Sequence, residues 1–150
     1  MGYNGSVPNL PIKPILERNI DVFFSGNINK RRIPFFFYAN YYLLIEKLSF
    51  KLRNIKISFH KRFGGGFHPS VYAKLLMDTK IALIPEGYLS NNSFRFFEAA
   101  RYGTTIITPK LYKYWFYKNF PGIQVKNWGG IYKHINQILN DPEKLHQLHK

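Results

Sequence analysis

The stretch that decides the fold runs from Tyr72 to Pro109 and reads YAKLLMDTKIALIPEGYLSNNSFRFFEAARYGTTIITP. Two short aliphatic and β-branched runs within it, 81–84 and 104–108, predict buried strands. Residues 91–93 are of the types that cap the start of a helix. A segment with helical spacing of apolar residues precedes each run: 70–79 and 94–102. This alternation of helix and strand is typical of βαβ units.

The same alternation continues in both directions from this stretch. Upstream, 20–24 and 55–59 predict two more strands, and downstream 123–125 predicts a fifth, followed by helices at 131–139 and from Pro142 onward. Five strands separated by helices predict an α/β fold with a doubly wound, mostly parallel, Rossmann-like sheet covered on both faces. We expect an N-terminal lead over 1–19 and a single domain over 20–150.

A long helix is predicted between the first two strands, starting near Pro34. We expect core packing to account for its Phe and Leu residues, with contact to anionic lipid as the alternative. Its apolar positions recur at 37, 41, 44, 45, 48 and 52.

Composition narrows the classes of function. The chain has no cysteine, which excludes disulfide frameworks, cysteine-based zinc sites, iron–sulfur clusters and thiol catalysis. Its 22 Lys and Arg against 8 Asp and Glu give a net charge of +14, which favours an anionic partner. Part of the imbalance reflects scarce acidic residues, because only Glu17, Asp21 and Glu46 precede residue 60.

Targeting signals are weak in this sequence. The longest apolar stretch, 33–45, is interrupted by Pro34 and Asn40 and is shorter than the roughly 20 residues that a spanning helix needs. The first residues lack a basic start followed by an apolar run. We therefore expect a cytoplasmic protein, with the inner face of a membrane as a peripheral location.

Ligands of open parallel sheets bind at the carboxyl ends of the strands. Gly26 follows the first predicted strand, but no G-x-G-x-x-G pattern begins there, which argues against a dinucleotide cofactor. Asn27 and Arg32 nevertheless place hydrogen-bond donors and positive charge there, suited to phosphate oxygens. A solvated basic loop is the alternative interpretation.

The second strand is followed by a basic and glycine-rich segment. Lys61 and Arg62 precede three glycines at 64–66, whose backbone allows close approach of a ligand or gives a mobile loop. His60 and His68 flank the segment, but two histidines without a third ligand predict no metal site.

The sharpest cluster lies at the start of the helix predicted from 94 to 102. Its N-terminus and Ser93 suit a diphosphate, Arg95 suits phosphate oxygens, and Glu98 suits the vicinal hydroxyls of a ribose. An ion pair between Arg95 and Glu98, three residues apart, is the alternative. We expect Phe97 and Ala100 to pack on the sheet.

The run from Tyr72 to Pro109 resembles the nucleotide-sugar-binding half of GT-B glycosyltransferases, most closely the exostosin-like families. Those families carry a run of the type "skF-L-P-G, S-R-x-x-E-A-x-x-G-x-x-P-V-I", and 23–27 is similar to their upstream strand. The resemblance implies that Glu98 holds the ribose, that Arg95 and Ser93 contact the diphosphate, and that Gly103 permits the turn into the next strand.

The resemblance also implies a function and its partners. The chain would be the C-terminal, donor-binding half of a GT-B fold that transfers a sugar from a nucleoside-diphosphate sugar to an acceptor hydroxyl. That sugar nucleotide is a substrate, and no cofactor or bound metal is expected. The acceptor would be a saccharide or a lipid-linked sugar held by a separate N-terminal domain.

Two other classes of function stay open at this point. A basic Rossmann-like module could bind nucleic acid without catalysis, using Lys and Arg for phosphates and aromatic rings for stacking. A regulatory α/β domain that docks on another protein is the third class.

Overall fold

The computed structural model describes residues 10–61, 66–88, 93–114, 117–118, 120 and 122–149. Five strands form one sheet in the order β2-β1-β3-β4-β5, and every neighbouring pair is parallel. The strands are β1 (Ile20–Asn27), β2 (Ile55–His60), β3 (Thr79–Leu83), β4 (Thr105–Pro109) and β5 (Ile123–Val125). The predicted α/β class and all five predicted strands are therefore confirmed.

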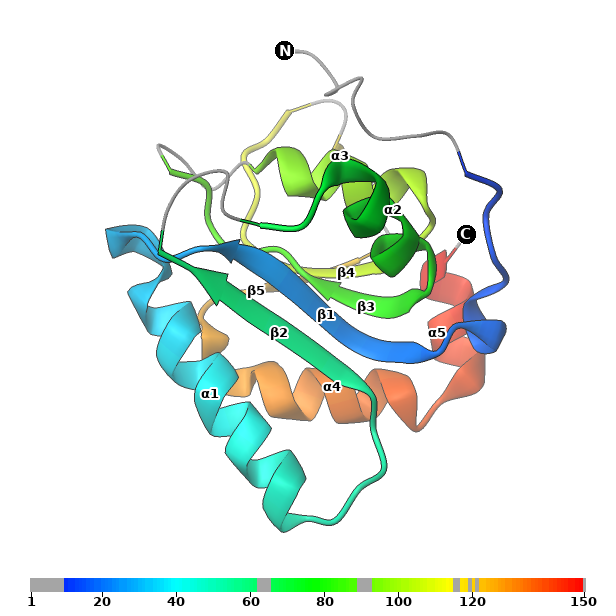
Figure 1. Cartoon of the computed structure of the whole chain (residues 1–150), viewed down its shortest axis with the longest axis horizontal. Coiled ribbons are helices and arrows are strands. Elements are labelled where there is room, and N and C mark those ends of the chain that lie inside the picture. Colours follow the sequence, from blue (N-terminus) through cyan, green and yellow to red (C-terminus); the bar gives the residue numbers. More distant parts are fainter. Residues whose placement is uncertain are drawn as a thin grey trace.

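Helices cover both faces of the sheet, as Figure 1 shows. The helices are α1 (Ile33–Leu48), α2 (Pro69–Met77), α3 (Phe94–Arg101), α4 (Ile131–Leu139) and α5 (Pro142–His149). On one face α1, α4 and α5 pack over side chains such as Val22 and Phe24 of β1. On the other face α2 and α3 pack over Phe23, which lies between Val22 and Phe24 in β1. Alternate residues of β1 thus supply two separate cores, as the strand period of two requires.

The strand order places a topological switch point between β1 and β3. The chain leaves β1 through α1 to reach β2 on one side, and then returns through α2 to β3 on the other side. Because the two crossovers depart in opposite directions, the carboxyl ends of β1 and β3 face an opening between the connections. Ligands of doubly wound sheets bind at such a position.

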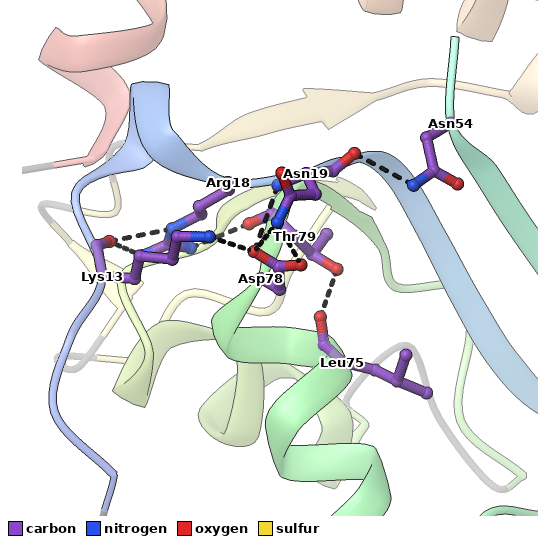
Figure 2. Close-up of polar contacts among 7 residues, drawn as sticks. All are labelled: Lys13, Arg18, Asn19, Asn54, Leu75, Asp78 and Thr79. Carbon is purple, nitrogen blue, oxygen red and sulfur yellow. Dashed lines mark hydrogen bonds and ion pairs between the residues drawn. The ribbon is translucent and has the colours of Figure 1, made fainter.

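The opposite, amino-terminal edge is held by a polar network, part of which is drawn in Figure 2. Arg18 is buried, and its guanidinium donates to the carbonyl oxygens of Lys13, Thr79 and Tyr102 and to the hydroxyl of Thr104 at 2.6–3.2 Å. Burial lowers the pKa of Arg18 to about 10, so the side chain stays charged at neutral pH. Its hydrogen bonds satisfy the buried charge and join the chain before β1 to the starts of β3 and β4.

A second part of this network surrounds Asp78. Its carboxylate accepts from the Lys13 ammonium at 2.6 Å and from the backbone and side-chain nitrogens of Asn19 at 3.0–3.2 Å. The side chain of Asn54 in turn donates to the Asn19 carbonyl at 3.0 Å. The described part of the predicted lead therefore packs on the domain, with Ile15 of the 3₁₀ turn η1 (Ile15–Glu17) in the core.

The expected inner face of α3 is wrong, and the expected core packing of α1 holds for Phe35 but not for Phe37, Leu44 or Leu48. In α3, Phe96 and Ala99 face the sheet, whereas Phe97 and Ala100 are exposed. Both pairs have the same three-residue spacing, so periodicity alone does not choose between them. The structure buries Phe96 because its ring meets Tyr117 and Phe120 at centroid distances of 4.8 and 4.9 Å.

The second correction concerns α1. The residues that face the core are Phe35, Ala39, Tyr42 and Glu46, whereas Phe37, Tyr41, Leu44 and Leu48 are exposed, as is Leu52 beyond the helix. Phe35 takes the inner position because its ring fits among Phe24, Phe59 and Trp128. Most of the apolar positions that recur with helical spacing in the sequence, at 37, 41, 44, 48 and 52, therefore lie on the outer face.

Gly103 ends α3 with a φ of +60°, in the left-handed region that favours glycine. A Cβ at this position would lie 2.7 Å from the His149 ring. Its predicted role in the turn toward β4 is therefore confirmed.

Candidate functional site

Several predicted site residues meet at the switch point. A small cavity between the carboxyl ends of β1 and β3 and the start of α3 has a volume of about 10 Å³, which is room for roughly one water molecule. A ligand as large as a nucleotide would therefore lie across its mouth. The polar side chains among its lining residues are Ser25, Arg32, Tyr72, Ser93 and Arg95.

Arg32 joins the two strands that frame this cavity. Its Nε donates to the Glu86 carbonyl at 2.7 Å, and its Nη1 donates to both the backbone and side-chain oxygens of Asn27 at 3.0 Å. Arg32 is buried, which lowers the pKa of its guanidinium, and the nearby charge of Arg95 lowers it further. Arg32 thus joins Asn27 at the end of β1 to the segment that follows β3, and its guanidinium adds positive potential at the site.

Gly26 makes room for that arrangement. A Cβ at Gly26 would lie 2.9 Å from the Arg32 Nη1 atom and 2.9 Å from the Phe24 ring. The Arg32 guanidinium is fixed by three hydrogen bonds and the Phe24 ring is buried, so neither group can move aside without loss. Gly26 is therefore required for close packing at this strand end.

Arg95 and Glu98 form an ion pair on the first two turns of α3. The Arg95 Nη1 donates to the Glu98 Oε2 at 2.8 Å, and the guanidinium lies 4.0 Å from the centroid of the Tyr72 ring. The Glu98 side chain is buried, whereas the Arg95 side chain is 42% exposed. Burial raises the pKa of the Tyr72 phenol, which stays neutral beneath the guanidinium. The geometry thus holds Arg95 between an aromatic face and a carboxylate, with donors left toward solvent.

Ser93 caps the same helix. Its hydroxyl accepts from the Arg95 backbone N–H at 3.4 Å, and its extended backbone turns the chain into α3. The positive end of the α3 dipole therefore points toward the cavity that Ser93 and Arg95 line.

A serine–histidine contact lies at the same edge of the sheet, and the sequence analysis did not find it. The Ser25 Oγ and the His60 Nε2 are 2.9 Å apart, because the parallel register of β1 and β2 pairs Asn27 with His60 at the two strand ends. Ser25 is buried and also lines the cavity. Only knowledge of the β1–β2 register could have joined two residues 35 positions apart.

The remaining predicted residues lie elsewhere at this edge. Lys61 follows the end of β2 and is exposed, outside the residues that line the cavity. Arg62 and most of the glycine segment lie outside the described residues. Within the described ranges, no group of three or more His, Asp or Glu side chains is placed to hold a metal ion.

Comparison with known proteins gives no family assignment: no protein-family profile matches the chain, and no curated protein matches it. Among the described residues, no helix combines the length and apolar character needed to cross a bilayer. Function is therefore inferred from the fold and from the geometry of this edge.

Proposed function

We propose that the chain is the donor-binding domain of a glycosyltransferase of the exostosin-like GT-B type, which binds a nucleoside-diphosphate sugar at the β1/β3 switch point. One observation carries the proposal. The Arg95–Glu98 pair stands on the first turns of α3, beside the Ser93 cap and the cavity between the strand ends.

The diphosphate would lie at the N-terminus of α3. The free N–H groups of a helix start and its dipole attract an anion, and the Ser93 hydroxyl adds a polar contact. The partly exposed Arg95 guanidinium matches phosphate oxygens in shape and charge, and Arg32 adds positive potential beneath it.

The ribose would then contact Glu98. A carboxylate has two acceptor oxygens, which suit the two hydroxyls of a ribose. We expect a bound diphosphate to draw Arg95 partly away from Glu98, because a phosphate competes for the same guanidinium donors. This exchange gives Glu98 an oxygen for the sugar and couples recognition of the ribose to recognition of the phosphates.

The reaction itself needs a second domain. The bond between the sugar's anomeric carbon and the diphosphate oxygen would break as that carbon bonds to an acceptor hydroxyl, which gives up its proton to a base on the acceptor side. Arg95 and the α3 N-terminus would stabilise the charge on the departing nucleoside diphosphate. The described residues thus supply donor binding, and a separate domain would supply the acceptor, a saccharide or a lipid-linked sugar.

Calorimetric titration with UDP, GDP, ADP and CDP tests the proposal. We expect saturable binding of one of the four and a loss of about tenfold or more in affinity in Arg95→Met and in Glu98→Gln, since one charged hydrogen bond contributes about 1.5–3 kcal/mol. Arg101→Met, which removes one positive charge from the last turn of the same helix, is the matched control and should bind as the wild type does.

A nucleic-acid-binding module is the second candidate, and the net charge of +14 is the observation that favours it. It predicts binding of an oligonucleotide but of no mononucleotide, with equal effects of Arg95→Met and Arg101→Met. That result would overturn the donor-binding proposal.

A further inference from the structure

Helix α1 is apolar on two opposite faces, and among the described residues only one of these faces is covered. The inner face packs on the sheet through Phe35, Ala39 and Tyr42, which are fully buried. The opposite face consists of Ile33, Phe37, Tyr41, Leu44 and Leu48, spaced four, four, three and four residues apart so that they form one stripe along the helix. All five are exposed, and Phe37 is 66% exposed. A helix that is apolar all round is normally covered on all sides.

The turn after α1 adds two more exposed apolar residues, Phe50 and Leu52, and Phe50 has a strained backbone conformation. Phe50 has a φ of 52°, in the left-handed region where a bulky residue is an outlier and glycine is the usual choice. Its side chain is 90% exposed, and that of Leu52 is fully exposed. No packing among the described residues explains a strained, exposed phenylalanine at this position. A contact between the Phe50 ring and a partner outside the domain would account for this strain.

The charge around the stripe is positive. Lys30, Lys47 and Lys51 are exposed at or beside α1. Glu46 is the one acidic residue between Val22 and Met77 in the sequence, and it is buried in an ion pair with Arg53 at 2.8 Å. Outside the sheet, the elements with the most contacts to α1 are α4, the 3₁₀ turn η4 (Trp128–Gly130) and η2 (Lys30–Arg32), and their sequences contain no Asp or Glu. The sheet beneath α1 contributes Asp21 of β1, whose carboxylate is paired with the Lys80 ammonium at 2.8 Å. The stripe therefore faces outward in a setting of basic residues without exposed carboxylates on these elements.

We propose that the α1 stripe, with Phe50 and Leu52, is a membrane-docking surface that lies in the interface of a bilayer rich in anionic lipid. Phe, Leu and Ile side chains would enter the acyl boundary, Tyr41 would stay at headgroup level, and the lysines would meet lipid phosphates. A second copy of the chain fits this face poorly, because each copy carries a charge of +14 and like charges repel. The inference does not depend on nucleotide binding.

The test measures binding of the full chain to vesicles by co-sedimentation. We expect strong binding to vesicles made of equal parts phosphatidylglycerol and phosphatidylcholine, and weak binding to phosphatidylcholine alone. The double variant Phe37→Gln with Leu44→Gln should lose more than about tenfold of its partitioning, because two apolar side chains no longer leave water. Leu16→Gln is the matched control, since Leu16 is as exposed as Leu44 but lies on η1, and it should bind as the wild type does.

A second variant keeps the proposal testable if the double variant folds poorly. Phe50→Gly relieves the left-handed strain, so it should unfold at a higher denaturant concentration while it binds anionic vesicles several-fold less tightly. Three outcomes would overturn the proposal: equal binding to both vesicle types, an equal loss in Leu16→Gln, or a dimer in sedimentation that the double variant abolishes without any vesicle binding.

Discussion

At the scale of single residues, two buried arginines connect neighbouring segments, one at each end of the sheet. Arg18 joins the strand starts, and Arg32 joins the strand ends, each through hydrogen bonds to backbone carbonyls. The sequence predicts Arg32 as a phosphate ligand, and this stays a prediction. In the structure its Nε and Nη1 atoms donate to Glu86 and Asn27 and so also support the strand ends. Arg95 lies at the same edge, and its side chain is 42% exposed. Arg32 and Arg95 both follow a predicted strand in the sequence, and only the structure shows that one is buried and the other partly exposed.

Asp78 provides a prediction about pH at this scale. Burial alone would raise the pKa of Asp78, but hydrogen bonds from Lys13 and Asn19 outweigh it and lower the pKa below 3.8. A carboxyl group whose pKa is lowered in the folded state stabilises the fold above its unfolded pKa and loses that contribution as pH falls through the folded pKa. We expect Asp78→Asn to cost at most about 1 kcal/mol at neutral pH, because the pair is partly exposed.

The measurement is urea unfolding of the wild type and Asp78→Asn at several pH values. The difference in the free energy of unfolding should be constant above about pH 5 and shrink toward zero as the pH falls below 3.8. A difference that stays constant down to the acid transition would contradict the role given to Asp78.

At the scale of elements, α1 shows what sequence periodicity can and cannot provide. The bounds of the helix and its neighbouring strands follow from the pattern of apolar residues and from Pro34. Which face turns inward does not, because both faces are apolar, and the choice depends on how the Phe35 ring fits among Phe24 and Trp128. The same ambiguity, between Phe96 and Phe97, reversed the predicted orientation of α3.

The two faces of α1 predict very different responses to one substitution. Phe35→Ala empties a fully buried position and should lower the free energy of unfolding by about 3–5 kcal/mol. Phe37→Ala, two residues away on the exposed face, should change it by less than about 0.5 kcal/mol. Denaturant unfolding of both variants checks this. Similar losses in both would show that the stripe containing Phe37 is covered within the domain.

The candidate site was predictable only in part, for a related reason. The strand ends, the capping serine and the Arg95–Glu98 spacing are local features, and the parallel sheet brings them to one edge. The Ser25–His60 contact and the position of Tyr72 under Arg95 depend on strand register and helix packing. Such long-range contacts leave no mark in local composition.

At the scale of the whole molecule, the two edges of the sheet and the outer face of α1 differ in chemical character. The amino-terminal edge is a closed polar network, the carboxyl edge carries the candidate site, and the α1 face carries exposed apolar and basic residues. The net charge of +14 favours anionic ligands at more than one of these places. Salt dependence distinguishes binding in a site from binding to the general charge.

We expect nucleoside-diphosphate binding to weaken only modestly between low and physiological salt. A single diphosphate involves few charge contacts, whereas a duplex bound across the basic surface would lose affinity with a logarithmic slope of about −0.9 per phosphate contact. Calorimetry at several salt concentrations measures the slope. A steep slope for the mononucleotide, equal in Arg95→Met and in the wild type, would indicate nonspecific attraction.

The most direct test of the central claim is a map of amide chemical shifts on isotope-labelled protein as the tightest-binding nucleoside diphosphate is added. We expect saturating shifts at the end of β1 around Ser25 and Gly26 and at the start of α3 around Ser93 and Arg95, with α1 unchanged. Shifts spread over the basic residues of α1, or no saturating shift at the carboxyl edge, would contradict it.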